Sequence, residues 1–245
     1  MTVILAIIKK ESVSYLLSPL AAFLIASFII VSSVLTFYLG MFFEKELADL
    51  EAFFSWHPYI YLFFTPAVSM RLWAEERQQD TFEFLVSLPS PVWKIVLGKF
   101  IAAWIIIIIA LIFSGTMWIG VSLIGEPDHM MVFTGYMASI LLAGMYLSFG
   151  SYISSLSDSQ VIAYIKTVIA NGIFMFSGLP VVVDMMNIFL PADIVYWISW
   201  ASFYTNFMTV IQGVIELKFL VFAISFIIFW LFMTCVSIET KGRVV

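Results

Sequence analysis

Long apolar runs separated by short polar connections make up almost the whole chain. Six runs approach or exceed the ~20 apolar residues that a helix needs to cross a bilayer. They cover residues 19–43, 53–73, 95–123, 132–154, 160–183 and 217–238. Backbone N–H and C=O groups cannot stay unpaired in lipid, so we expect these runs to be helices. The pattern predicts an all-α polytopic membrane protein with six transmembrane helices, forming a single domain over residues 1–245.

The first 18 residues carry a shorter, amphipathic pattern. Apolar side chains recur at helical spacing at Val3, Ile4, Ile7 and Ile8, and a charged stretch begins at Lys9. A helix of this kind buries its apolar face at a membrane surface and keeps its polar face in water. We therefore expect an interfacial helix on the inner surface of the membrane.

Residues 184–216 are too apolar for a solvated loop, yet Pro191 interrupts them. Tyr196, Trp197 and Trp200 are aromatic residues of the kind enriched at membrane interfaces. A full span here would place the C-terminus on the wrong side of the membrane. We expect short re-entrant helices in the outer leaflet, placed before the last span.

The composition supports a membrane location for the whole chain. Hydrophobic residues make up 63% of it and charged residues 11%, against roughly 25% charged residues in soluble domains. The net charge is −5 and no basic stripe is present, so nucleic acid is not an expected partner. The single cysteine, Cys235, lies in an apolar run and is interpreted as a packing residue.

The distribution of Lys and Arg predicts the orientation, because these residues concentrate in cytoplasmic loops. With the N-terminus inside, nine of the eleven fall on the cytoplasmic side if Lys166 snorkels there; only Lys45 and Lys218 fall outside. The nine are Lys9, Lys10, Arg71, Arg77, Lys94, Lys99, Lys166, Lys241 and Arg243. The predicted outer loops are acidic instead. We expect a multi-pass protein of the bacterial inner membrane with both termini in the cytoplasm.

The densest charged patch lies between the second and third runs, in the first predicted cytoplasmic loop. It contains Arg71, Glu75, Glu76, Arg77, Asp80 and Glu83. The spacing of Asp80 and Glu83 is that of a capping box, and it predicts a short helix over residues 81–88 that ends before Pro89. So short a helix needs a packing partner. The alternative is a solvated loop whose charges only enforce the topology.

The stretch from Pro66 to Trp104 resembles the permeases of type-2 ABC exporters. The features that carry the resemblance are Glu75, Glu76, Arg77, Thr81, Glu83, Leu85, Pro89, Trp93 and the Val-Leu-Gly-Lys sequence of residues 96–99. The second run is most similar to the gliding-motility-associated branch, through Phe53, Phe54, Pro58, Pro66, Ala67, Val68, Met70 and Arg71. Two positions depart from the family pattern, where Asp80 replaces a glycine and Asn206 replaces a histidine.

The resemblance implies that the helix between the second and third spans is a coupling helix that contacts an ATPase subunit. Its expected coupling residues are Glu75, Glu76, Arg77, Asp80, Thr81, Glu83 and Leu85. The chain has no G-x-x-x-x-G-K-[ST] motif, so ATP and Mg²⁺ are expected in a separate ATPase dimer and no cofactor in this chain. Six spans would form half a pathway, which implies a second permease chain, identical or related. Membrane lipid is a further expected partner, and a periplasmic accessory protein is a possible one.

Individual residues of the chain bear on two other classes of function. An intramembrane protease would need Arg at position 80, where this chain has Asp80, so no catalytic residue is predicted. A permease for copper-enzyme maturation would draw on soft ligands for Cu(I), and the predicted outer face carries His57, His129, Met130, Met131, Met185 and Met186. Methionine also fills apolar packing gaps, and no metal site is predicted. An assembly scaffold without translocation is a further alternative.

Few polar residues lie inside the spans, and these are the candidates for a pathway. Lys166 and Asn171 lie in the fifth run, and Trp197 and Trp200 would edge its outer end. An ionisable residue inside a membrane span is a functional candidate by default, although a snorkelling lysine explains Lys166 equally well. So sparse a polar lining suits a lipid-like or amphipathic cargo, or a machine that transmits force to an outer partner.

Overall fold

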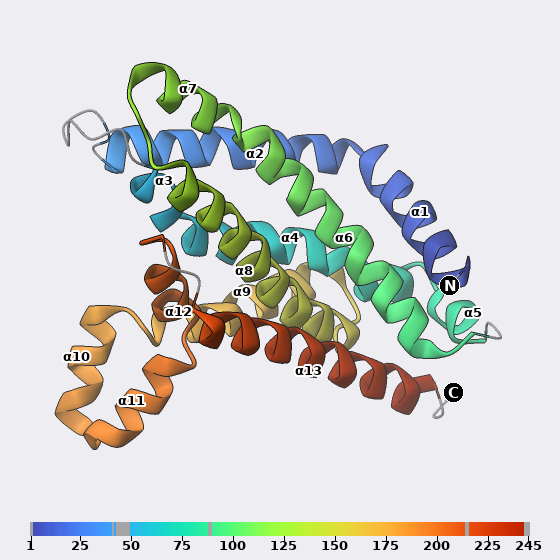
Figure 1. The fold of residues 1–245 in the computed structure, drawn as a ribbon. Helices are drawn as coiled ribbons and strands as arrows, with labels where there is room; N and C mark the ends of the chain where they lie inside the picture. The colour runs from blue at the N-terminus through green and yellow to red at the C-terminus, as the bar shows by residue number, and fades with distance from the viewer. Residues whose placement is uncertain (1, 41, 43–49, 88–89, 214–215, 243–245) are drawn as a thin grey trace.

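The computed structural model describes residues 2–40, 42, 50–87, 90–213 and 216–242, and these residues form helices and connections without a strand (Figure 1). The all-α fold class is therefore confirmed. The helices are α1 Thr2–Leu16, α2 Pro19–Val34, η1 Leu35–Leu39, α3 Glu51–Ser55, α4 His57–Gln78, α5 Phe82–Val86, α6 Val92–Ser114, α7 Thr116–Ile124, α8 His129–Ser155, α9 Gln160–Phe176, α10 Pro180–Phe189, α11 Ala192–Trp200, α12 Phe203–Val210 and α13 Leu217–Gly242.

Within the described part of the chain, four helical segments are long and apolar enough to cross a membrane. They are Pro19–Leu39, Val92–Ile124, His129–Ser155 and Leu217–Thr240. A fifth is added if α9 and α10 count as one span, although the two helices meet at a bend of 77°. Length and composition thus support four or five spans, and the expected count of six additionally requires α4. The predicted end of the first run at residue 43 lies outside the described residues.

α4 differs from the expected second span because it continues into the charged stretch. It is one helix from His57 to Gln78. Arg71 and Glu75 therefore belong to a helix, whereas the sequence predicted a loop for the charged patch. Most of its residues up to Ala74 are buried between α2, α6, α8 and α9. A helix surrounded by protein can be less apolar than one that faces lipid, which is why α4 falls short on composition alone.

Close contact between α4 and α8 explains the small residues on α8. A side chain at Gly150 would collide with Ser69 of α4, and small residues of this kind allow transmembrane helices to approach closely. The serines of α8 also bond to α4: the Trp73 indole N–H donates to Ser151 Oγ at 3.1 Å, and the Trp73 backbone N–H donates to Ser154 Oγ at 3.2 Å.

The fifth run is broken earlier than expected. Residues 160–183 do not form one continuous helix, because α9 ends at Phe176 and the chain bends by 77° before α10 begins at Pro180. A side chain at Gly178 would collide with Ser202 and Thr205, so the turn is packed tightly against α12. The expected break at Pro191 is confirmed, since α10 ends at Phe189 and α11 begins at Ala192.

The two ends of the bundle carry different elements. The beginning of α1, the end of α13 and the short helix α5 lie at one end, whereas α10 and α11 lie at the other (Figure 1). α1 packs along α6, where a side chain at Gly98 would come within 2.8 Å of Ile7 Cγ2. α1 is therefore attached to the bundle along one side, while Val3, Leu5, Val13 and Leu16 remain exposed on its open side. A sequence pattern for a surface helix did not reveal this protein contact.

Candidate functional site

Five side chains from three helices form a charged cluster at the end of the bundle that carries α5. We use the term charged cluster for Glu11 of α1, Arg71, Glu75 and Glu76 of α4, and Lys99 of α6. They line a cavity of about 390 Å³ that α5 closes on one side. Two of the five, Glu75 and Glu76, were predicted as coupling residues. Arg71 and Lys99 were predicted only among the cytoplasmic charges and the residues of the family resemblance, and Glu11 was given no role.

Lys99 joins the three helices. Its ammonium lies 2.6 Å from Glu76 Oε1 and 3.5 Å from Glu11 Oε1, and its side chain is only 3% exposed. The ammonium also lies 5.5 Å from the centre of the Trp73 ring, on the ring face, where a cation is attracted by the π-system. Because so deeply buried an ammonium depends on its partners, Lys99 fixes α1, α4 and α6 relative to one another.

Arg71 makes the second connection between α1 and α4. Its Nε donates to Glu75 Oε2 at 2.7 Å and its Nη1 donates to Ser18 Oγ at 3.1 Å. The guanidinium also lies over the Tyr15 ring at 5.1 Å, and the Tyr15 hydroxyl donates to the Val68 carbonyl at 3.3 Å. The turn between α1 and α2 is thereby tied to the end of α4.

Glu76 stays ionised over a wide pH range. Burial raises its pKa, but the Lys99 ammonium and the Thr81 hydroxyl, which donates to Glu76 Oε2, outweigh burial and hold the pKa below its usual value. A carboxyl group with a lowered folded-state pKa stabilises the fold above its unfolded-state pKa. That contribution is lost as the pH falls through the lowered value. The cluster should thus be intact at neutral pH and weaken in acid.

Arg77 anchors α5 to the bundle. Its guanidinium lies over the Phe82 ring at 4.7 Å, and its Nη1 donates to Asp158 Oδ1 at 3.3 Å. Phe82 of α5 is buried, and Asp158 lies in the connection between α8 and α9. α5 is therefore held by an aromatic contact on one side and reaches the α8–α9 connection through Arg77.

Asp80 does not cap α5, and the expected capping box is not formed. The N-cap of α5 is Thr81, and no side chain caps this helix. Asp80 instead ends α4: its φ is +56°, its N–H donates to the Arg77 carbonyl at 3.1 Å, and the Thr81 N–H donates to the Glu76 carbonyl at 2.9 Å. These two bonds define a Schellman motif with Asp80 at the position where glycine is usual. α5 is also shorter than the predicted helix over residues 81–88 and ends at Val86.

Replacing Asp80 by glycine should raise the free energy of unfolding by about 0.5–1 kcal/mol, because glycine adopts positive φ without steric cost. Unfolding in mixed detergent micelles measures the change. Gln79→Gly is the matched control, since Gln79 has φ −100° and gains nothing from glycine. Equal destabilisation by the two substitutions would show that the Asp80 carboxylate is needed after all.

Glu83 and Phe84 are the exposed residues among those of α5 whose burial is described, and Phe84 also lines the cavity of the charged cluster. Phe84 is 72% exposed. Leu85, which was predicted as a coupling residue, is half-buried; it lines the cavity of the charged cluster and packs against the core. The sequence placed all of these residues on one helix, but only the structure separates the anchored face from the exposed one.

The four predicted pathway residues do not form one site. Lys166 is exposed on the outer side of α9, whereas Asn171 is fully buried and its Nδ2 lies 3.5 Å from the Tyr146 carbonyl of α8. Trp197 and Trp200 lie on α11, and the Lys218 ammonium lies over the Trp200 ring at 5.6 Å. Asn171 is thus a candidate for internal packing, whereas Lys166 is on the surface of the chain.

The two histidines considered as Cu(I) ligands in the copper alternative both contact other side chains. His57 was expected on the outer face, but its side chain is fully buried. Its Nδ1 lies 2.7 Å from Ser139 Oγ, and the Tyr61 hydroxyl lies 2.7 Å from the same oxygen. His129 accepts a bond from the Trp118 indole N–H at 3.1 Å. Among the described residues, no group of three or more His, Cys, Asp or Glu could hold a metal ion. The His57–Ser139–Tyr61 contact is an internal connection between α4 and α8 that the sequence did not indicate.

Comparison with known proteins bears on this arrangement. A family model described as ABC-2 family transporter protein matches residues 60–238. The match includes most of α4, all of α5 and α6, and most of α13, and it covers well over half of the chain. No curated protein shows significant similarity to the chain.

Proposed function

Because this chain belongs to the ABC-2 transporter family, we propose that it is the permease subunit of an ATP-driven ABC transporter. In this proposal it couples ATP hydrolysis by a separate ATPase to export, or to force transmission, across the inner membrane. The chain itself contains no nucleotide-binding motif. ATP and Mg²⁺ would therefore be bound by the partner subunits, which act as a dimer.

The observation that carries the proposal is the position of α5. This helix sits at the end of the bundle with Phe84 exposed and Phe82 anchored beneath Arg77. An exposed aromatic residue on a firmly held helix is the kind of group that dominates protein interfaces. α5 would be the element that the ATPase grips.

The charged cluster would carry the motion of α5 into the membrane helices. Thr81, directly before α5, bonds to Glu76 of α4, and Lys99 connects Glu76 to α6 and to α1. A displacement of α5 would therefore move three helices together. Closure of the ATPase dimer would shift these helices relative to α9 and α13.

The remaining features of the proposal concern assembly and location. A second permease chain, identical or related, would complete the pathway. The location would be the bacterial inner membrane with both termini in the cytoplasm. The Lys and Arg distribution supports this, as does the position of the beginning of α1 and the end of α13 at the same end of the bundle as α5. Membership of the gliding-motility-associated branch stays a prediction from the second run. The copper-maturation alternative loses support with the burial of His57.

Isolation of the chain from its native membrane tests the proposal. A chain tagged after Val245 and extracted in mild detergent should carry an ATPase subunit in equal amount, and ATP hydrolysis by this complex should respond to the lipid environment. Mass spectrometry identifies the partner, and an ATPase assay measures its activity. A fully folded chain that repeatedly comes without any ATPase would favour the scaffold alternative.

A further inference from the structure

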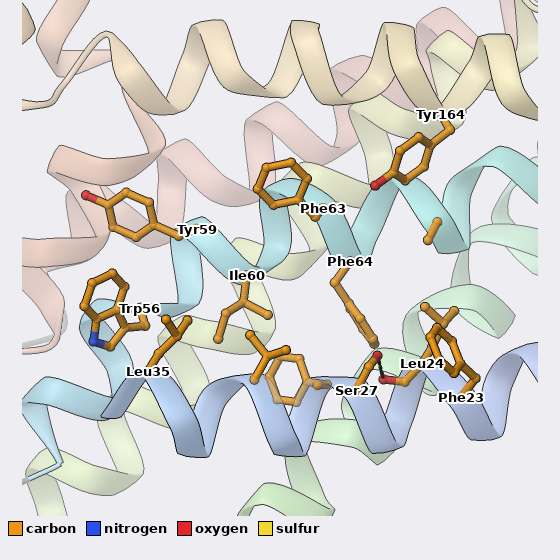
Figure 2. Close-up of a pocket in the computed structure, with 13 residues that line it drawn as sticks. Phe23, Leu24, Ser27, Leu35, Trp56, Tyr59, Ile60, Phe63, Phe64 and Tyr164 are labelled. Carbon is orange, nitrogen blue, oxygen red and sulfur yellow. Dashed lines mark hydrogen bonds between the residues drawn. The ribbon is translucent and has the colours of Figure 1, made fainter. Parts of the chain in front are cut away.

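An apolar groove runs along the outside of the bundle between α2 and α4, well away from the charged cluster. Its volume is about 500 Å³, within the range of roughly 300–1,000 Å³ that is usual for small-molecule sites. Figure 2 shows Phe63 and Phe64 of α4 above the groove and Leu24 and Ser27 of α2 below it. The Ser27 hydroxyl already donates to the Leu24 carbonyl at 2.9 Å, so the groove walls offer contacts to an apolar ligand.

The length of the groove matches one leaflet of a bilayer. Along α4 it extends from Trp56 to Ala67, which is about 16 Å at 1.5 Å per residue. The hydrocarbon core of a bilayer is about 30 Å thick, so a single leaflet accounts for about half of it. A ligand that fills the groove lengthwise therefore has the length of an acyl chain in one leaflet.

The end of the groove at Trp56 is suited to a polar group. Trp56 and Tyr59 lie together at this end, whereas Tyr164 and Phe23 lie at the other (Figure 2). The two rings of the Trp56 end are 5.5 Å apart. Tryptophan and tyrosine favour the boundary between hydrocarbon and headgroups because each has an apolar body and a polar tip. The groove is therefore apolar along its length and interfacial at one end, as a lipid molecule is.

We propose that this groove binds one acyl chain of a membrane phospholipid, with the lipid headgroup beside Trp56 and Tyr59. A helix from a second copy fits less well, since a helix with its side chains is about 10–12 Å wide and the groove holds only about 500 Å³. Phe23 and Phe63 are exposed at 68% and 57%, so a chain can enter sideways from the bilayer. The site does not depend on an ATPase partner.

Photochemical labelling tests the proposal on the full chain, with any subunits that purify with it, in nanodiscs of defined phospholipid. The probe is a phosphatidylethanolamine with a diazirine on one acyl chain, and mass spectrometry locates the adducts. We expect adducts concentrated on the groove walls of α2 and α4. Ser27→Trp and Ala67→Trp, which fill the groove from opposite walls, should each lower this labelling about tenfold, as expected when a few methylene groups lose contact.

Ile228→Trp is the matched control, because Ile228 is 62% exposed on α13, away from the groove. It should leave labelling of the groove unchanged. A cooperative thermal unfolding transition shows that a variant is folded. If one groove variant does not fold, the labelling of the other variant and the positions of the adducts on the unchanged protein decide whether the groove binds the acyl chain. Adducts spread evenly over α2, α4 and α13, or indifferent to both groove variants, would overturn the proposal. So would a disulfide between two copies through Val31→Cys in a Cys235→Ala background, with the groove unlabelled.

Discussion

Replacing Lys99 by methionine is expected to lower the free energy of unfolding by about 3 kcal/mol, the low end of what removal of one partner from a buried ion pair costs. The substitution keeps most of the side-chain volume but leaves Glu11 and Glu76 without their shared cation. The two carboxylates are 14% and 19% exposed, so water compensates for only part of the loss. Unfolding of the purified chain in mixed detergent micelles measures the change.

Two further variants separate charge from packing in this prediction. Lys94→Met lies on the same helix and changes the same residue type, but Lys94 contacts only the Trp93 ring face in the described structure, so its effect should stay within about 0.5 kcal/mol. Adding Glu76→Gln to Lys99→Met removes one of the stranded charges and should restore part of the stability. A loss no larger for Lys99→Met than for Lys94→Met would mean that the cluster does not hold the helices together.

The long apolar helices were accessible to sequence reasoning because a 20-residue apolar run has few alternatives in lipid. α8 and α13 begin and end close to the predicted bounds. α4 was harder, because its polar residues face other helices and its charged end continues the same helix. The apolar composition of a segment indicates whether it faces lipid. It does not distinguish a polar loop from a polar helix that is surrounded by other helices.

The candidate site shows a different limit of the sequence. The short helix and its cationic and acidic neighbours were predicted, since they are close together in the chain. Lys99 and Glu11 were not predicted as a pair, because nothing local connects two residues so far apart. Asp80 was misinterpreted for a physical reason: aspartate favours helix N-caps and also tolerates positive φ, so the same residue fits the beginning of α5 and the end of α4.

The exposed aromatic residue of α5 provides the sharpest test of coupling. Phe84→Asp is expected to weaken binding of the ATPase subunit by about 2 kcal/mol or more, which is about 30-fold, since exposed aromatic residues at the centre of an interface have effects of this size. The chain should remain folded, because Phe84 is 72% exposed. Leu85→Asp would be a poorer test, since Leu85 packs against the bundle. Its replacement would destabilise the fold, so a loss of ATPase binding could not be assigned to the docking contact.

Titration of the purified ATPase subunit onto the chain in nanodiscs measures this affinity, with transport-linked ATP hydrolysis as the second readout. Leu17→Asp is the matched control, because Leu17 is 80% exposed at the turn between α1 and α2 and lies outside α5. The Leu17→Asp chain should bind the ATPase subunit with the same affinity as the unchanged chain. If Phe84→Asp binds the ATPase normally and sustains hydrolysis, α5 is not the docking element, and the partner must grip another part of this end of the bundle. If both substitutions weaken binding equally, the ATPase contact extends over α1 and is not centred on Phe84.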